Sequence, residues 1–288
     1  MKRTVAFCLA LILVFTSGCS LLKVNESAVE RGTTEASPAE ESSKITDPHE
    51  AYRLVTEKMA SLTEVDVSTT MEMKISVMGM QMNMLMGVAS QCILKDEKVD
   101  RMKYIVNMTS EALAAITGKE TISIEEYYVD GMMYVNSFDG KHKMPVEEDD
   151  VQEQMGSYTE TMQGKITEDG SFETLTIGEE DGMTVLYFTA EGKKMLDFIL
   201  AAMPDTVDNE MFEEALSLGD VEGKMYINSE WYIERMDYDM VMKVQQDGMD
   251  ISMDMKAKTT YHNPGQNVVI EFPDFSDYEG LDDEETEP

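Results

Sequence analysis

Residues 70–86 read Thr-Met-Glu-Met-Lys-Ile-Ser-Val-Met-Gly-Met-Gln-Met-Asn-Met-Leu-Met. Apolar and polar side chains alternate along this stretch, which is the pattern of a β-strand with one buried and one solvated face. The alternation breaks at Met78-Gly79 and then resumes, which indicates a hairpin. With a turn at these two residues, Val77 lies opposite Met80 and every pair on that face is apolar. A shift of one residue would place each methionine opposite a polar partner, so the register is well specified.

A second long hairpin is predicted around Asp247-Gly248, a sequence typical of a type I′ turn. Its expected pairs are Val244 with Ile251, Met242 with Met253, Met240 with Met255 and Tyr238 with Ala257. Shorter hairpins are expected at Asp130-Gly131 and at Asp181-Gly182, where Ile177 would meet Leu186 and Leu175 would meet Phe188. Strands at 221–228 and 267–272 complete a chain dominated by antiparallel connections.

Four helices are expected beside these strands. Asp47-Pro48-His49-Glu50 has the form of a capping box with proline at the first helical position, and apolar residues repeat at helical spacing from 48 to 62. The same spacing predicts helices at 191–203 and 207–218, and a weaker one at 148–162. The fold class is therefore α+β, mainly antiparallel sheet.

The composition excludes several classes of protein. The 288 residues include 57 acidic and 23 basic side chains, giving a formal charge of −34. Non-specific nucleic-acid binding needs a surplus of Lys and Arg, and anionic lipid surfaces would repel this chain. With 42% hydrophobic residues the chain can nevertheless form a core. The 27 methionines are the unusual feature.

The N-terminus indicates secretion. Lys2 and Arg3 precede an apolar run from Val5 to Phe15, which is too short to span a bilayer and is typical of a signal peptide. Thr16-Ser17-Gly18-Cys19 resembles the lipobox of bacterial lipoproteins, which implies cleavage before Cys19 and acylation of its thiol. The alternative is an ordinary signal peptide with a chance cysteine. Lipidation would place the protein on the extracytoplasmic face of the bacterial cell membrane, held by its N-terminal lipid.

The expected organisation has four parts. A signal peptide (1–18) precedes a lipidated, disordered tether rich in Ser and Glu (19–46), a β-rich domain (47–278) and an acidic tail (279–288). After cleavage and acylation only Cys92 remains as a free thiol, so an intramolecular disulfide or a Cys-based zinc site is excluded. We expect Cys92 to be a small buried hydrophobe.

Three interpretations of the methionine faces stay open. They are core positions where methionine replaces Leu or Val; or they form an adaptable apolar groove, because unbranched thioethers repack around varied ligands; or they bind a soft metal such as Cu(I) through Met-x-Met-x-Met. No His or Cys lies in either methionine-rich run, and His49, His142 and His262 are far apart in sequence.

Signatures of catalysis are missing. The sequence has no G-x-S-x-G, H-E-x-x-H, P-loop or dinucleotide loop, so we expect neither an enzyme nor a bound cofactor. Acidic pairs such as Glu125-Glu126 and Glu213-Glu214 are expected to be solvated surface, because carboxylates are abundant throughout the chain. No partner protein can be read from the sequence.

The order of these elements resembles uncharacterised Gram-positive lipoproteins whose domain is similar to the LolA and LppX lipoprotein-carrier superfamily. The elements that carry the resemblance are the lipobox, the tether, the methionine hairpin, the Tyr127-Tyr128-Val129-Asp130-Gly131 hairpin and a closing strand from Val268 to Phe272. The resemblance implies an unclosed, half-barrel antiparallel sheet with covering helices and an apolar cavity for lipid or acyl chains.

We therefore expect a membrane-anchored, non-enzymatic binder of a lipid or another hydrophobic ligand. The alternative is an envelope lipoprotein with a structural or interaction role, whose methionine face is only core. The expected ligand-lining residues are Met71, Met73, Ile75, Val77, Met80, Met82, Met84, Met86, Tyr238, Met240, Met242, Val244, Ile251, Met253 and Met255.

Overall fold

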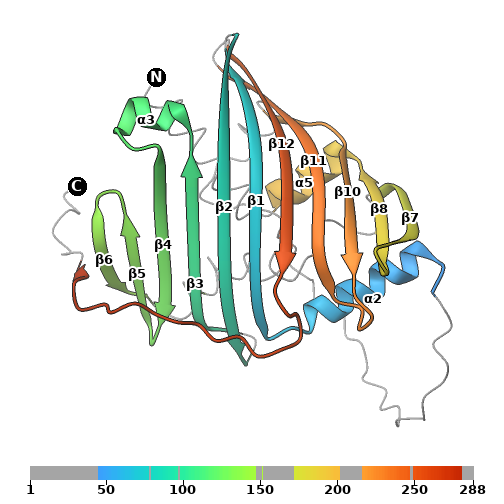
Figure 1. The fold of residues 1–288 in the computed structure, drawn as a ribbon, viewed down its shortest axis with the longest axis horizontal. Coiled ribbons are helices and arrows are strands. Elements are labelled where there is room, and N and C mark those ends of the chain that lie inside the picture. The colour runs from blue at the N-terminus through green and yellow to red at the C-terminus, as the bar shows by residue number, and fades with distance from the viewer. Residues whose placement is uncertain are drawn as a thin grey trace.

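The computed structural model describes residues 45–77, 79–96, 98–146, 151, 172–201, 216–246 and 249–280. Their strands form one sheet in the order β13-β6-β5-β4-β3-β2-β1-β12-β11-β10-β8-β7, with β9 paired to β11 outside this order (Figure 1). All neighbouring pairs are antiparallel except the short β13–β6 pair, and the two ends of the sheet do not join. The expectation of a mainly antiparallel, unclosed sheet is confirmed.

The elements have these bounds. The strands are β1 (Glu64–Val77), β2 (Met80–Lys95), β3 (Lys98–Thr109), β4 (Thr121–Val129), β5 (Met132–Ser137), β6 (Gly140–Pro145), β7 (Phe172–Glu180), β8 (Met183–Ala190), β9 (Leu216–Leu218), β10 (Val221–Ile227), β11 (Ile233–Gln246), β12 (Met249–Tyr261) and β13 (Glu279–Gly280). The helices are α2 (Pro48–Ala60), α3 (Glu111–Thr117) and α5 (Gly192–Ala201). Within the described ranges, none of these helices has the length and apolar character needed to cross a bilayer.

The hairpin registers predicted from the sequence are confirmed. Val77 pairs with Met80 and Val244 with Ile251, so both long hairpins have their apolar side chains on one face. The short turns have the backbone that a type I′ turn requires, because Asp130 and Gly131 have φ of 53° and 75° and Asp181 has φ of 51°. The turn residues 247–248 lie outside the described residues.

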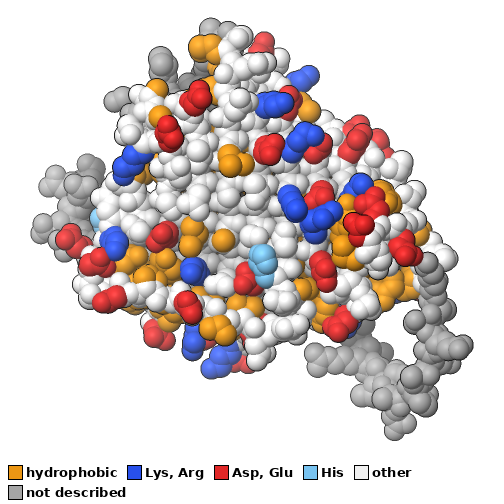
Figure 2. Space-filling view, in the orientation of Figure 1, with side chains coloured by type: hydrophobic (Ala, Val, Ile, Leu, Met, Phe, Trp, Pro, Cys, Tyr) orange, Lys and Arg blue, Asp and Glu red, His pale blue; other side chains and the backbone are white. Residues whose placement is uncertain are grey.

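The two faces of the sheet differ in what packs on them. On the inner face lie α2 and α5, which pack chiefly against β7 and β9 at one side of the sheet (Figure 1). The outer face carries the charged residues of the alternating pattern, and Figure 2 shows Lys, Arg, Asp and Glu spread over it. The described covering helices therefore account for only part of the inner face.

The first helix forms where the sequence predicts it. Asp47 is the N-cap of α2, and its side-chain carboxylate accepts a hydrogen bond from the backbone N–H of His49 at 2.9 Å. Pro48 occupies the first turn, where no intrahelical donor is needed. The buried side of α2 packs into the core, and the ring of Tyr52 meets Phe172 of β7 edge-on at a centroid distance of 4.8 Å.

Two predicted elements are wrong. Residues 267–272 form no strand; the segment 262–278, which we call the strap, crosses the outer face of the sheet (Figure 1). Pro264 and Pro273 cannot donate ladder hydrogen bonds, which disfavours a strand between them. At the end of the predicted helix 207–218, Leu216 and Leu218 instead alternate with Ser217 in β9 and pair with β11.

The rest of the predicted 207–218 helix, residues 207–215, lies outside the described residues. So does almost all of the predicted helix at 148–162, of which only Val151 is described, in helical conformation. The predicted helix 191–203 corresponds to α5 and the predicted strand 221–228 to β10. β3 and α3 have no counterpart among the elements predicted from the sequence.

Aromatic rings fasten the strap to the sheet. Phe275 stacks on Tyr134 of β5 with ring centroids 3.8 Å apart, and also meets Tyr127 of β4 at 5.6 Å. Lys141 of β6 forms an ion pair with Asp277 at 2.6 Å. Burial and the neighbouring Glu125 carboxylate, which accepts its hydrogen bond, raise the pKa of the Tyr127 hydroxyl. The outer face of β4–β6 is thus covered by the chain itself.

Candidate ligand-binding face

The two methionine-rich hairpins lie side by side. β1 pairs with β12, so Met73 is the partner of Met84 on one side and of Met255 on the other, and Met255 in turn pairs with Met240. A neighbouring row consists of Met82, Ile75, Met253 and Met242. The predicted ligand-lining residues therefore form one continuous apolar surface on the four central strands. The sequence could not indicate this pairing, because β1 and β12 are distant in the chain.

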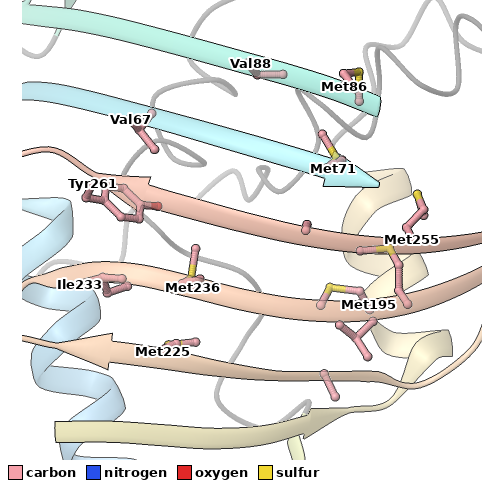
Figure 3. Packing of buried hydrophobic residues seen from close by; sticks show 14 of the residues in the cluster. Val67, Met71, Met86, Val88, Met195, Met225, Ile233, Met236, Met255 and Tyr261 are labelled. Atoms are coloured by element: carbon pink, nitrogen blue, oxygen red, sulfur yellow. The ribbon is translucent and has the colours of Figure 1, made fainter. Parts of the chain in front are cut away.

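Most of this surface is core. Residues with less than 10% of their surface exposed are Met71, Met73, Ile75, Met86, Met240, Met242, Val244, Ile251, Met253 and Met255. Met195 of α5 belongs to the same cluster, as do Ile233 and Met236 of β11 (Figure 3). The burial of these residues favours the interpretation that the methionines in this part of the face are core positions.

The surface opens toward the β1–β2 turn. Val77, Met82 and Met84 are only half-buried, as is Tyr238 of β11, and Met80 is 66% exposed. The predicted lining set therefore divides into a buried centre and a partly accessible end on β2. Only the second group is available to a ligand without rearrangement of the core.

The inner face continues as an apolar surface onto β4–β6. Register places Ile122 opposite Met108 of β3, Ile124 opposite Val106, and Met144 opposite Met133. Four inner side chains pack on the core but remain only half-buried, and they are those of Ile122, Ile124, Val135 and Met144. We call the half-buried inner side chains at the turn end of β2 and on β4–β6 the open strip. Its members are Met82, Met84, Ile122, Ile124, Val135 and Met144.

One carboxylate interrupts the open strip. Glu126 of β4 lies between Ile124 and Tyr128 in the inward register and pairs across strands with Tyr104 and Val135. Burial raises the pKa of the Glu126 carboxyl above its ordinary value, and no neighbouring charge contributes to that shift. Among the described residues, none donates a hydrogen bond or forms an ion pair with it. The sequence-based expectation that Glu126 is solvated surface is wrong.

Glu125, in contrast, faces outward. It accepts hydrogen bonds from the Tyr127 hydroxyl at 3.0 Å and from the Asn136 amide at 3.1 Å. The sequence did contain a signal for Glu126, because the alternation Ile122, Ile124, Tyr128 places position 126 on the apolar face.

The outer face has a groove of a different character. It measures about 860 Å³ and lies over β2, β1, β12 and β11. Its lining includes Glu72, Lys74, Glu222, Asp239, Asp254 and Lys256. Lys256 forms an ion pair with Asp239 at 3.0 Å. The exposed apolar side chains of Leu85 and Val241 also line it, so this groove combines charged and apolar groups.

A hydrogen-bonded cluster joins the strands at the β7 side of the sheet. The Glu180 carboxylate accepts bonds from Lys224 Nζ at 2.8 Å, the Tyr187 hydroxyl at 2.8 Å and the Tyr226 hydroxyl at 2.9 Å. These hydrogen bonds lower the pKa of Glu180 to about 2, and the bond from Lys224 contributes most. The Arg235 guanidinium lies 3.7 Å from the centroid of the Tyr226 ring. Through Glu180 the cluster links side chains of β7, β8 and β10.

Groups of metal-binding side chains are not assembled in the described ranges: no three His, Cys, Asp or Glu residues lie together as a metal site. Cys92 is buried on the inner face of β2, and burial raises the pKa of its thiol to about 12. It therefore behaves as the predicted small hydrophobe. Cys19, the predicted acylation site, lies outside the described residues.

A model of a protein family of unknown function, DUF6612, matches residues 47–274. The chain belongs to this family. No curated protein matches its sequence significantly. The DUF6612 assignment names no activity, so it leaves the chemistry to be argued from the side chains described above.

Solved structures similar to this DUF6612 chain are remote. A DUF1329 family protein from Desulfovibrio piger is 11% identical, with 78% of this chain and 96% of that chain covered and a TM-score of 0.26. A putative outer membrane lipoprotein-sorting protein domain from Vibrio parahaemolyticus is 12% identical, with coverages of 76% and 94% and a TM-score of 0.26. A LolA superfamily protein from Nitrosomonas europaea is 8% identical, with coverages of 75% and 94% and a TM-score of 0.23. Scores this low say nothing about a ligand.

Proposed function

We propose that the protein is a membrane-anchored, extracytoplasmic, non-enzymatic lipoprotein that binds a lipid or another hydrophobic ligand on the inner face of its open sheet. One observation carries the ligand-binding part. The apolar inner surface extends across β4–β6, beyond the strands against which α2 and α5 chiefly pack, and its side chains there stay half-buried in the open strip. An apolar surface of this kind is the usual feature of a hydrophobic binding site.

The methionines at the accessible end support an adaptable site. Met82 and Met84 are unbranched and half-buried, so their side chains can change rotamer without disturbing the packed centre of the sheet. The fully buried methionines, such as Met253, contribute stability and do not contact a ligand in this proposal. The predicted lining set is thereby reduced to its β2 end and extended onto β4–β6.

Anchoring is proposed from the sequence. Thr16-Ser17-Gly18-Cys19 after an apolar run is the pattern that supports acylation at Cys19. Replacing Cys19 by Ser is expected to move the protein from the membrane fraction to the soluble extracytoplasmic fraction, measured by fractionation and immunoblotting. Retention of the variant in the membrane fraction would contradict lipid anchoring.

Ligand binding is tested with adjacent residues that face opposite sides of β2. Met84 belongs to the open strip, whereas Leu85 faces outward. Native mass spectrometry and organic extraction of the purified protein should detect a bound hydrophobic molecule. We expect Met84→Gln to reduce its occupancy by about tenfold, the effect of placing an unpaired amide against an apolar ligand, with Leu85→Gln as the control. Absence of any releasable or exchangeable apolar ligand would overturn the proposal.

The second candidate is a structural or interaction role in the envelope with no small ligand. It is favoured by the burial of Met73, Met253 and Met255, each less than 5% exposed. In that case the methionines only fill the core, and the Met84→Gln and Leu85→Gln variants would behave alike in the extraction experiment.

A further inference from the structure

The position of Glu126 restricts which ligand the open strip accepts. A carboxylate in an apolar surface loses hydration, and this loss is tolerated when a counter-charge or hydrogen-bond donors compensate. Its strand neighbours on the same face are Ile124 and Tyr128, and its cross-strand neighbour on β5 is Val135. None of these side chains carries a positive charge. On β3 its cross-strand neighbour is Tyr104, which is also uncharged. Within the described ranges no basic side chain forms an ion pair with Glu126, so the protein there supplies no counter-charge.

The basic residues of β3–β6 lie on the other face. Lys103 donates a hydrogen bond to the backbone carbonyl of Glu271 in the strap, and Lys141 is paired with Asp277 of the strap. Lys143 pairs across strands with Tyr134, which is also outward. Side chains in this register cannot reach the inner face, since successive residues of a strand point to opposite sides. His142 is inward, but Val135 lies between it and Glu126 in the pairing row.

We propose that Glu126 is the head-group anchor of the open strip, which binds amphiphiles with a cationic, hydrogen-bond-donating head group and an apolar chain. The proposal rests on the ligand-binding function proposed above and adds the class of ligand. An ammonium head placed at Glu126 forms a charge-assisted hydrogen bond beside apolar side chains, while the chain lies along Ile124 and Ile122, which follow on the same face of β4.

Two further features agree with a cationic head group. The formal charge of −34 produces a field that attracts cations and disfavours anionic amphiphiles. The raised pKa of Glu126 has burial as its cause, so a bound cation would restore the ionised form that burial disfavours. A ligand with an anionic head would instead add a second uncompensated negative charge.

The test uses three ten-carbon amphiphiles that differ only in head group: decylammonium, decanol and decanoate. Each is titrated calorimetrically into the mature chain carrying Cys19→Ser, at physiological ionic strength. Decanol reports on the apolar surface alone, and the other two report on the head group. We expect decylammonium to bind most tightly and decanoate most weakly.

Glu126→Gln keeps the shape of the side chain and removes its charge. We expect it to weaken decylammonium binding by about tenfold or more, the range for a hydrogen bond to a charged group, and to leave decanol within about threefold. Glu120→Gln, an exposed carboxylate just before β4, is the matched control for overall charge and should leave all three affinities unchanged. Circular dichroism and thermal unfolding verify that both variants are folded.

The outcomes separate the two proposals. If decanol and decylammonium both fail to bind the mature chain that carries Cys19→Ser alone, the proposed ligand-binding function is wrong. If decanol binds but decylammonium has the same affinity for the Glu126→Gln and Glu120→Gln variants, the ligand-binding function stands and the role of Glu126 is wrong. Tighter binding of decanoate than of decylammonium would also overturn the inference.

Discussion

Replacing one central methionine measures how much stability the buried part of the sheet provides. Met253 of β12 is 0% exposed and pairs with Ile75 on β1 and Met242 on β11. Met253→Ala removes the side chain beyond Cβ and leaves a cavity between strands, since the flanking strands are fixed by their ladders. Buried Met→Ala changes cost about 2–5 kcal/mol in the free energy of unfolding, and we expect about 3 kcal/mol here.

The matched control is Met80→Ala. The alternation of β2 places Met80 on the same apolar face of the sheet as Met253, but Met80 is 66% exposed. Its truncation should therefore change the free energy of unfolding by less than about 0.5 kcal/mol. Met253→Leu conserves volume and is expected to cost less than about 1.5 kcal/mol. The comparison therefore distinguishes packing volume from any special property of the thioether.

The assay is urea unfolding followed by the fluorescence of Trp231, the single tryptophan, which packs against the core. With a denaturant slope of about 3 kcal/mol per molar urea, 3 kcal/mol lowers the midpoint by about 1 M. Equal midpoint shifts for Met253→Ala and Met80→Ala would refute the burial assigned to the methionine face. A shift below about 0.3 M for Met253→Ala would also refute it, since that corresponds to about 1 kcal/mol.

Three other predictions concern the strap, the free thiol and the inward carboxylate. Phe275→Ala removes the ring that stacks on Tyr134. We expect limited proteolysis within 262–278 to become at least several-fold faster, while the far-ultraviolet circular dichroism spectrum is unchanged. An unchanged cleavage rate would show that the rings do not hold the strap. Cys92 is buried with its pKa raised to about 12, so a thiol reagent at pH 8 should label it only after unfolding in denaturant; labelling of the native protein within minutes would contradict its burial. Burial raises the pKa of Glu126 in the folded state, so the ionised form destabilises the fold: this penalty is absent below the unfolded-state pKa and grows as pH rises through the folded-state pKa. Glu126→Gln should therefore raise the melting temperature at pH 8 more than at pH 4, with Glu120→Gln as the control, and a pH-independent difference would argue against the raised pKa.

Local pattern was enough to predict the hairpins. The alternation in 71–86 fixes which residues face each other, because a shift of one residue exchanges the two faces of the strand. Asp130-Gly131 and Asp181-Gly182 adopt the positive φ values that their turn type requires. These features depend on neighbours within one hairpin, which sequence reasoning captures.

Features set by distant parts of the chain were not predicted. The pairing of Met73 with Met255 depends on which edges of two hairpins meet, and alternation alone carries no information on that. Residues 267–272 have a strand-like composition, yet they cross the sheet because aromatic contacts with Tyr127 and Tyr134 hold the strap there. Glu126 differs from the solvated carboxylates that the composition predicts, because its place in the alternation of β4 puts it on the inner face.

The β1–β12 pair also has a consequence for folding. Val77 and Ile251 are direct partners although more than half of the chain separates them. As the chain is made from its N-terminus, the long edge of β1 stays without its partner until nearly the whole sequence has been synthesised, and an unpaired strand edge is prone to wrong pairing. Closing such a long loop is slow compared with forming a hairpin, so the centre of the sheet assembles late. The most buried methionines therefore become buried last, and a chain truncated before β12 would expose them.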